Sequence, residues 1–338
     1  MPSSSERVPH IPRRYHFVWF GSRFPVSNRI AIESCVRHCR GAEVILWHSD
    51  ELSQHASYRE LLELGVRAER LDESVFDLGA RANPPFDVAR LQQIWRSVSS
   101  HVSRSNLARA IVLYRHGGIY LDMDVLVVRD FDRYRNYPAF VGSEHIVWPG
   151  WALRGASLQR FVLSPLLDLL RKLTVALPEG ERLFQRTSGW YPKAVNGAVL
   201  GARAGHAFLA ELLRQTARVP EEEWPLKHRL GTHVLQRTVE AYPGVDLMIL
   251  PPEAFFPLGP EVSRHYFRHR TRPELSARRI VRPETSALHW YSSVSDITAF
   301  SRDELRELEQ RTVYGHLCAE YIAAAAELLR TALPEAAE

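Results

Sequence analysis

The sequence predicts an α/β fold in which helices cover a mostly parallel sheet. Two short runs rich in aromatic and β-branched residues, 15–20 and 43–47, have the length and composition of buried strands. The segment between them, residues 27–39, carries apolar side chains at helical spacing. The order strand, helix, strand favours parallel pairing, because the helix carries the chain back across the sheet.

The rest of the chain extends this pattern. Residues 87–114 predict two helices that meet near residues 101–105, and Gly117 and Gly118 supply the left-handed conformation that ends the second helix. Residues 119–128 then read as a strand that contains two carboxylates. Later elements alternate, with helices expected at 158–173, 207–217 and 232–241 and strands at 194–200 and 247–250. A final helix is expected from a capping box at 301–304 through the alanine-rich residues 321–333.

Composition narrows the class of protein. The chain has 338 residues, 43 Lys and Arg against 39 Asp and Glu, a net charge of +4, and 45% hydrophobic residues. These values are typical of soluble globular chains and exclude wholesale disorder, collagen-like repeats and a multispan membrane protein. Three cysteines are too few for a disulfide scaffold, and their spacing suits no four-ligand zinc site, so we expect free cytosolic thiols.

The chain ends and the linker pattern predict one domain without a membrane anchor. Residues 1–10 are polar and lack the apolar core of a signal peptide, so a cytoplasmic location is expected. The most apolar stretch, 158–177, is interrupted by charged residues and Pro165, which indicates an amphipathic or buried helix. We expect a flexible terminus at 1–10, one compact domain at 11–300 and a C-terminal helix at 301–338 packed on it.

The positive charge is local. Seven arginines lie between Arg264 and Arg282, together with Tyr266 and Phe267. This segment is either a solvated loop or a loop that approaches an anionic ligand or a membrane surface. A nucleic-acid partner is not expected, since a surplus of four charges makes no strong field and no binding motif accompanies it.

Asp122 and Asp124 are the first candidates for chemistry. In an extended segment, residues two apart leave the same face, and two like charges beside an apolar strand are unfavourable unless a cation compensates. Hard carboxylate oxygens suit Mg²⁺ or Mn²⁺, which keep sites for water and phosphate. A second Asp-x-Asp, at Asp130 and Asp132, lies among arginines and is interpreted as a solvated turn.

The segments 105–109 (SNLAR) and 113–124 (LYRHGGIYLDMD) together resemble the sugar-binding region of DXD-containing retaining glycosyltransferases. Relatives in this family include initiation-type mannosyltransferases, α-1,4-galactosyltransferases, bacterial capsule and lipooligosaccharide transferases, and clostridial glucosylating toxins. Residues 11–21, 43–50 and 196–206 are similar to other family segments in the same order, and residues 289–293 more faintly so.

This resemblance implies a glycosyltransferase A fold, which is a Rossmann-like, mostly parallel sheet with helical additions. It also implies a nucleotide-sugar donor, with UDP-sugars favoured over GDP-sugars, and a Mn²⁺ or Mg²⁺ ion. Asp124 would hold the metal, with Asp122 acting directly or through water. The metal would then act as a Lewis acid on the leaving diphosphate.

Further site residues follow from the same resemblance. Val18 and Trp19 would pack on the nucleotide base, unless Trp19 is an ordinary core residue at a strand end. Arg109 falls where relatives use an Asp–Arg pair on the donor sugar, although the partner position is here Asn106, whose amide loses the charge-assisted bond. Arg109 is otherwise a structural arginine of its helix. Tyr120 would lie beside the sugar or ribose, and Asn196 would lie near the donor unless it is an asparagine of a strand turn.

His289 resembles the residue of a late family segment that completes the metal sphere or contacts phosphate; the alternative is a surface or core histidine. The function that the resemblance implies, with Asp122, Asp124 and Arg109 as the catalytic set, is metal-dependent retaining transfer of a hexose-type sugar. The acceptor would be a glycan, a lipid-linked saccharide or a protein, as in polysaccharide biosynthesis, and peripheral contact with the inner face of the membrane is compatible with it.

Two alternatives remain. A non-catalytic nucleotide-sugar or glycan-binding module would keep Trp19 and Arg109 but tolerate loss of Asp124. A metal-dependent phosphoesterase would need more clustered His and Asp ligands than the sequence shows beside Asp122.

Overall fold

The computed structural model of the chain describes residues 11–79, 83–147, 158–297 and 302–321. The expected flexible terminus at 1–10 lies outside the described residues, as do Ser301 of the expected capping box and residues 322–338 of the expected C-terminal helix. No helix in the described part of the chain is both long enough and apolar enough to cross a membrane.

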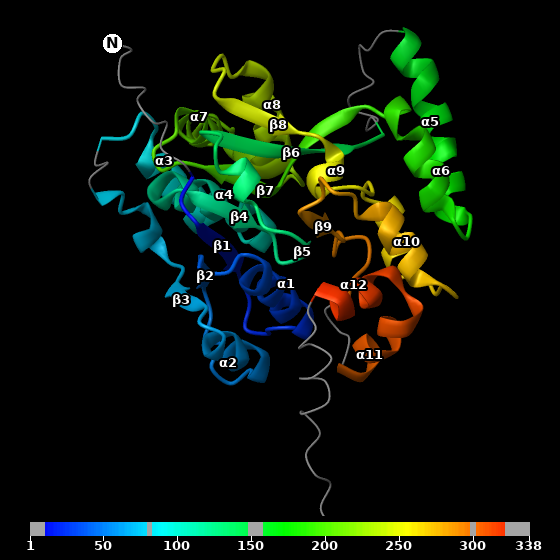
Figure 1. Cartoon of the computed structure of the whole chain (residues 1–338). Helices are drawn as coiled ribbons and strands as arrows, with labels where there is room; N and C mark the ends of the chain where they lie inside the picture. Colours follow the sequence, from blue (N-terminus) through cyan, green and yellow to red (C-terminus); the bar gives the residue numbers. More distant parts are fainter. Residues whose placement is uncertain (1–10, 80–82, 148–157, 298–301, 322–338) are drawn as a thin grey trace, which may run out of the picture.

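A seven-stranded sheet forms the centre of the described structure (Figure 1). In spatial order its strands are β3 (Arg67–Arg70), β2 (Glu43–His48), β1 (Arg14–Trp19), β4 (Gly118–Leu121), β7 (Lys193–Ala202), β6 (Ala139–His145) and β8 (Leu247–Leu250). Strand β7 runs antiparallel to both neighbours, and the other adjacent pairs are parallel. The predicted α/β class with a mostly parallel sheet is therefore confirmed.

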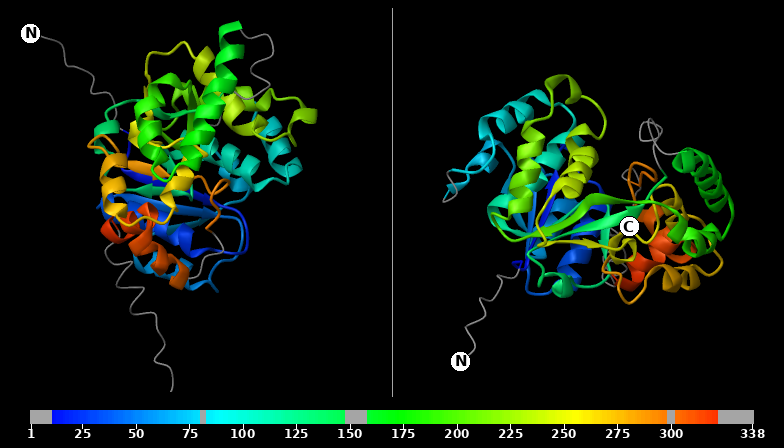
Figure 2. Two further views of the ribbon diagram at one scale, coloured as in Figure 1. Left: turned by 90° about the vertical axis from the view of Figure 1, so that its right-hand side faces the viewer. Right: turned by 90° about the horizontal axis from the view of Figure 1, so that it is seen from above.

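Helices cover both faces of this sheet and extend beyond one end (Figure 2). One face carries α3 (Val88–Ser97), α4 (His101–His116), α7 (Ala207–Ala217) and α8 (Val234–Ala241), and the other carries α1 (Val26–His38), α2 (Ala56–Glu63) and α9 (Pro252–Phe255). Beyond β6 lie α5 (Leu158–Ala176), α6 (Gly180–Thr187), α10 (Pro273–Ile280), α11 (Arg302–Arg311) and α12 (Val313–Tyr321).

Alternating side chains of the central strands divide the core into two layers. Tyr15 and Phe17 of β1 pack in the layer beneath α1 and α2, whereas Val18 packs in the layer beneath α3 and α4. This alternation follows from the period of two in a strand, and apolar side chains on both faces are expected where helices cover both. A third cluster, which includes Leu288 and Trp290, joins the region around β9 (Ala287–His289) to α10 and α12.

The prediction of one strand over 119–128 is wrong for residues 122–124. The chain leaves the large sheet after Leu121 and enters a second sheet at β5 (Val125–Val127), which pairs antiparallel with β9 (Ala287–His289). Asp122, Met123 and Asp124 therefore lie outside the ladder in a turn. The turn lets both carboxylates leave the apolar sheet, where burial without a partner would be unfavourable.

The expected final helix is also two helices where it is described. Thr312 separates α11 from α12, and its hydroxyl accepts a hydrogen bond from the N–H of Gly315 at 3.0 Å. A threonine that satisfies a free N–H in this way starts a new helix. The division into a domain at 11–300 and a packed C-terminal element stays a prediction.

The turn between α4 and β4 positions the carboxylates. Gly117 and Gly118 have φ values of 64° and 111°, and a Cβ at Gly118 would lie 2.4 Å from the carbonyl oxygen of Arg14. His16 of β1 donates from Nε2 to the carbonyl of Gly117 at 2.9 Å, while its Nδ1 accepts from the indole of Trp47 at 3.1 Å. These contacts hold β4 against β1 and so determine where Asp122 emerges.

Gly118→Ala should lower the free energy of unfolding by about 3 kcal/mol, because it adds a strained φ and a backbone clash. Gly65→Ala is the matched control, since Gly65 has a similar φ of 85° but nothing within 4 Å of the added Cβ. Its expected loss is about 1 kcal/mol. Urea denaturation measures both values, and equal losses would contradict the close approach of β1 and β4.

Burial lowers the pKa of His16 to about 3, against 6.5 in an unfolded chain. Between these two pKa values the histidine is protonated in the unfolded chain but neutral in the folded chain. The free energy of unfolding therefore falls as the pH is lowered from 6.5 to about 3. We expect this residue to contribute a slope of about 1.4 kcal/mol per pH unit. His16→Gln should reduce the slope measured by urea denaturation between pH 6 and 4, whereas His269→Gln, at an exposed position, should not. An unchanged slope in His16→Gln would contradict the assignment.

Candidate functional site

A cavity of about 390 Å³ opens where β1 and β4 end. Its lining comes from five parts of the chain: the end of β1, the start of α1, helix α4, the end of β4 with the β4–β5 turn, and the segment that begins at the end of β9. Ligands of α/β proteins commonly bind outside the carboxyl ends of parallel strands, because loops converge there. Six residues expected at the site line this cavity together with Val18: Trp19, Arg109, Tyr120, Asp122, Asp124 and His289.

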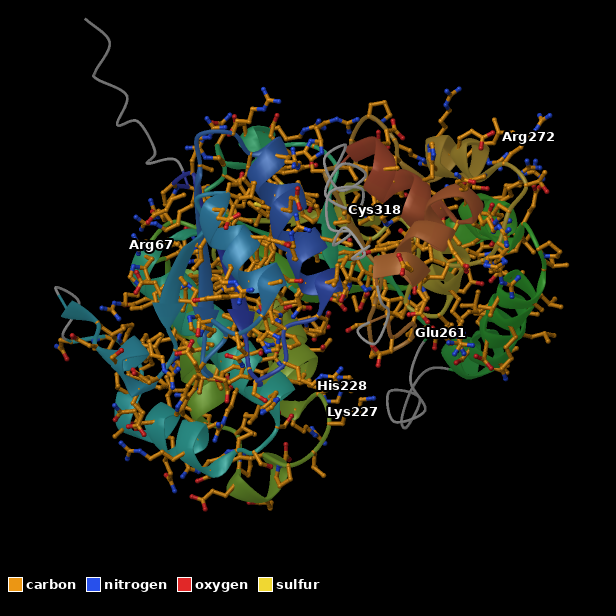
Figure 3. The ribbon with its side chains drawn as sticks, turned by 90° about the horizontal axis from the view of Figure 1, so that it is seen from below. Arg67, Lys227, His228, Glu261, Arg272 and Cys318 are labelled. Atoms are coloured by element: carbon orange, nitrogen blue, oxygen red, sulfur yellow. The ribbon has the colours of Figure 1, made fainter. Side chains whose placement is uncertain are left out.

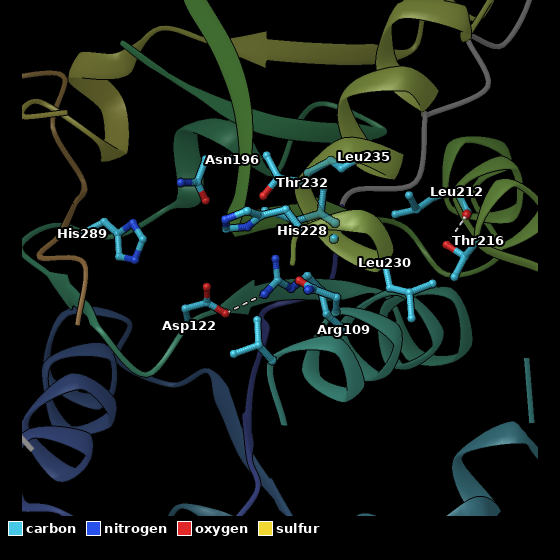
Figure 4. A pocket seen from close by; sticks show the side chains of 15 residues that line it. Arg109, Asp122, Asn196, Leu212, Thr216, His228, Leu230, Thr232, Leu235 and His289 are labelled. Atoms are coloured by element: carbon cyan, nitrogen blue, oxygen red, sulfur yellow. Dashed lines mark hydrogen bonds and ion pairs between the residues drawn. The ribbon is translucent and has the colours of Figure 1, made fainter. Parts of the chain in front are cut away.

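Asp122 is held by two donors. Its Oδ1 accepts from Nη2 of Arg109 at 2.8 Å and from the hydroxyl of Tyr120 at 2.7 Å. The guanidinium carbon of Arg109 lies 4.5 Å from the centre of the Tyr120 ring, which adds a cation–π contact. Burial acts to lower the pKa of Arg109, but the charge of Asp122 raises it, so the guanidinium stays charged. Figure 4 shows this ion pair at the edge of a second pocket.

Asp124 is held by His289 and by the main chain. Its Oδ1 lies 2.9 Å from Nε2 of His289, and its Oδ2 accepts from the N–H of Ser292 at 2.8 Å. Burial acts to raise the pKa of Asp124, but the attraction of His289 and these hydrogen bonds lower it to about 2. In the other direction, burial acts to lower the pKa of His289, and Asp124 raises it.

Asp122, Asp124 and His289 together fit a divalent cation. One ligand atom from each lies within 4.8 Å of the others, and no second group of three such residues is found in the described ranges. In the same ranges, the buried Nδ1 of His289 has no hydrogen-bond partner. Two carboxylates with one imidazole suit Mn²⁺, and Mg²⁺ accepts the carboxylates.

Trp19 and Val18 lie at the end of the cavity formed by β1. Trp19 is half-buried, donates from Nε1 to the carbonyl of Arg23 at 2.9 Å and meets the ring of Phe24 edge-on at 6.2 Å. Val18 is buried and also belongs to the core beneath α4. Both residues therefore line the cavity, and Val18 has a packing role as well.

Asn106 and Asn196 line a second, adjoining pocket of about 180 Å³ (Figure 4). Arg109, Asp122 and His289 line both hollows, so the two are continuous at these side chains. Close approach of the main chain shapes this pocket at two glycines. A Cβ at Gly197 would lie 2.2 Å from Nη1 of Arg109, and one at Gly231 would lie 2.4 Å from the amide nitrogen of Asn106.

Sequence reasoning missed the pair formed by Glu144 and Tyr291. The buried carboxylate of Glu144 accepts from the Tyr291 hydroxyl at 2.6 Å and from the amide of Asn196 at 2.8 Å. Burial raises the pKa of Glu144. Tyr291 has a φ of 55°, which is uncommon outside glycine. A charged residue directly after the uncharged run 139–143 was the available signal for Glu144.

The arginine segment lies away from the candidate site, so of the alternatives left open for it, contact with an anionic ligand at this site is not supported. None of its arginines lines either hollow. Arg268 instead donates to the carbonyls of Val175 and Leu177 at the end of α5, and Arg270 bonds Glu181 at 2.8 Å. The last carbonyls of a helix need donors from elsewhere, and these guanidinium groups supply them.

The second Asp-x-Asp forms the expected turn away from the cavity. The carboxylate of Asp130 accepts from the N–H of Asp132, and Asp132 pairs with Arg13 at 3.3 Å and with Arg135 at 3.0 Å. Asp132 is half-exposed, as expected for a solvated pair.

Comparison with known families confirms the resemblance drawn from the sequence. Residues 25–141 match the family described as glycosyltransferase sugar-binding region containing DXD motif. The match includes Asn106, Arg109, Tyr120 and both aspartates, and thus covers the segment that carries the resemblance.

Individual relatives are distant. An inositol phosphoceramide mannosyltransferase of Schizosaccharomyces pombe is 29% identical over 137 residues, which are 40% of this chain and 31% of that protein. An uncharacterized protein of Arabidopsis thaliana is 25% identical over 297 residues, 83% of this chain and 38% of that protein. The chain thus spans less than two fifths of the curated relatives it matches. Among solved structures, the apo form of the glycosyltransferase GlyE of Streptococcus pneumoniae has 14% identity and a TM-score of 0.45, with 94% of this chain and 63% of that chain covered.

Tyr291→Phe should lower the free energy of unfolding by about 2 kcal/mol, because the buried Glu144 carboxylate then loses a donor. Tyr266→Phe is the matched control: this hydroxyl is equally buried, and it has no partner in the described ranges. Its removal should change stability by less than about 0.5 kcal/mol. Thermal or urea unfolding of both variants measures the difference, and similar losses would rule out a stabilising role for the Glu144–Tyr291 bond.

Proposed function

We propose that this chain is a metal-dependent retaining glycosyltransferase. It would move a hexose-type sugar from a nucleotide-diphosphate donor, with a UDP-sugar favoured, to a glycan, lipid-linked or protein acceptor. The observation that supports this most directly is the convergence of Asp122, Asp124 and His289 in a cavity that also contains Trp19. The match of residues 25–141 to a DXD sugar-binding region supports the same class of reaction.

Asp122, Asp124 and His289 would hold Mn²⁺ or Mg²⁺. When bound, the ion supplies Lewis-acid stabilisation of the negative charge on the leaving diphosphate. His289 and Ser292 already hold the Asp124 carboxylate at one orientation. The low pKa of Asp124 keeps it ionised, as a metal ligand must be.

The remaining side chains would bind and orient the donor. Trp19 offers a flat ring for the nucleotide base. Arg109 uses one of its five N–H groups on Asp122, and its buried Nε has no partner in the described part of the chain. Because Arg109 lies between the two hollows, its guanidinium would bond to hydroxyls of the donor sugar. The neutral amide of Asn106 would donate and accept beside it.

Retention of configuration follows from the resemblance, and the lining of the two hollows is compatible with it. Asp122 and Asp124 are the only carboxylates among the described residues of that lining, and both are assigned to the metal. The described lining therefore contains no further carboxylate that could act as the nucleophile. We propose a same-face displacement in which the acceptor oxygen bonds to the anomeric carbon, the bond to the phosphate oxygen breaks, and that oxygen takes the acceptor proton.

The expected domain division and location belong to this proposal. The start of α12 buries Val313 and Tyr314, and Tyr314 meets the ring of Trp290 at 5.3 Å, which supports a C-terminal element packed on a catalytic domain at 11–300. Cys35 and Cys39 are buried free thiols, which supports a reducing, cytoplasmic compartment.

Hydrolysis of nucleotide sugars tests the proposal without knowledge of the acceptor. We expect the protein to hydrolyse one of a panel of UDP- and GDP-sugars with Mn²⁺ and to stop when EDTA is added. Asp124→Ala should lower the rate about 100-fold or more, since it removes a group that stabilises the leaving diphosphate. Asp132→Ala is the matched control from the second Asp-x-Asp and should retain the rate.

Two outcomes would count against it. Turnover that survives EDTA would overturn the metal assignment. Binding of a nucleotide diphosphate without hydrolysis of any donor would favour the non-catalytic binding module.

A further inference from the structure

Helix α5 carries a continuous apolar stripe on its outer face. Val162 and Leu166 are each 60% exposed, and the stripe recurs every three or four residues, so its members share one side of the helix. Among fourteen exposed large apolar side chains in the described ranges, six belong to this stripe: Val162, Leu163, Leu166, Leu169, Leu173 and Leu177. The helix lies along the outer edge of the molecule (Figures 1 and 2).

The opposite face of α5 attaches the helix to the body. Ser164, Leu167 and Thr174 are buried, and Arg171 pairs with Glu261 at the start of the arginine segment. A surface helix normally turns its apolar side inward and its polar side to water. In α5 apolar side chains occupy the outer side as well, and a contiguous patch of this kind marks an interaction surface.

The positive charge of the chain gathers on the same side. Residues 158–193 and 261–282, which include α5, α6 and α10, contain 13 Lys and Arg and 5 Asp and Glu, a net charge of +8. Because the whole chain carries +4, the remaining residues carry −4. The stripe thus belongs to a basic part of the chain, although the chain as a whole carries a net charge of only +4.

A basic cavity of about 540 Å³ opens at the C-terminal end of α5. Arg268, Arg270, Arg272 and Arg279 line it, together with the exposed Leu275. Arg268 and Arg270 are held in place by helix carbonyls and by Glu181. Arg272 extends outward at the same edge of the molecule as α5 (Figure 3). Guanidinium groups arranged around a hollow bind phosphate, because their forked N–H groups match its oxygens.

We propose that α5 lies in the plane of an anionic phospholipid bilayer, with its apolar stripe at the level of the acyl chains and headgroup phosphates in the arginine cavity. An amphipathic surface that combines leucines with flanking cations binds membranes in this way. Charge complementarity favours this occupant over a second copy of the chain, since a symmetric dimer would bring two +8 surfaces together. The surface does not depend on the proposed transferase activity.

This surface replaces the membrane contact expected at Tyr266 and Phe267. Tyr266 is buried, and Phe267 packs on the ring of Tyr314 at 4.9 Å. Neither ring is free to enter a bilayer. The arginines of that segment remain part of the surface, because they border the end of α5.

Vesicle flotation with the full chain tests the proposal. Binding should be at least tenfold stronger to phosphatidylcholine vesicles that contain one third phosphatidylglycerol than to phosphatidylcholine alone, and 0.5 M NaCl should weaken it. The double variant Leu166→Asp/Leu173→Asp should lose at least tenfold. Leu62→Asp, at an exposed leucine of α2, is the matched control and should bind like the wild type.

Arg272→Glu tests the cavity separately. We expect at least a fivefold loss on anionic vesicles and no change on neutral ones, since each charge near the surface is worth about a factor of five. This variant and the salt series decide the matter even if the double variant fails to fold in circular dichroism. Equal, weak binding of wild-type protein to both vesicle types would overturn the proposal. So would light scattering that finds a wild-type dimer and a Leu166→Asp/Leu173→Asp monomer, because the stripe would then be a contact between copies.

Discussion

The half-buried ion pair between Arg109 and Asp122 is the contact on which the site depends. It joins the centre of α4 to the turn after β4 at 2.8 Å, and it lies where the two hollows meet. Removing one member of this half-buried pair would leave the other charge uncompensated, which is unfavourable. Gly197 of β7 is required for this contact, because a side chain at this position would occupy the space of the guanidinium. The close approach at Gly118 holds β4 against β1 and so positions Asp122.

A second set of polar contacts ties the late segment 289–292 to this framework. Asp124 and Ser292 are 168 positions apart in the chain, yet they share a 2.8 Å hydrogen bond. Pairing of β5 with β9 puts Val125 opposite His289, which explains the convergence, and Glu144 holds Tyr291 from the other side. The candidate metal ligands are therefore preorganised by the fold, with little rearrangement left for ligand binding.

The arginine-rich segment has a structural role in addition to its proposed role in binding. Arg268 donates to carbonyls at the end of α5, and Arg270 pairs with the buried Glu181. These bonds hold in place a helix whose outer face is apolar. The same guanidinium groups leave a basic hollow beside that helix. One cluster of charge thus both stabilises α5 and distinguishes this side of the molecule from the rest.

Local patterns determined much of the fold and part of the site. The bounds of α7 and β8 were predicted as observed, and β1, β2 and α1 within a few residues, because hydrophobic periodicity reports burial directly. Asp122, Asp124 and Arg109 were identifiable because they lie within one short, family-like segment. Only the tertiary structure decided that the aspartates lie in a turn, that His289 joins them and that Glu144 holds Tyr291. It also decided that the arginines lie against α5 and that the stripe of α5 faces outward. Each of these features depends on contacts between segments that are distant in the chain. A periodic pattern predicts which side chains share a face, but it does not predict what packs against that face.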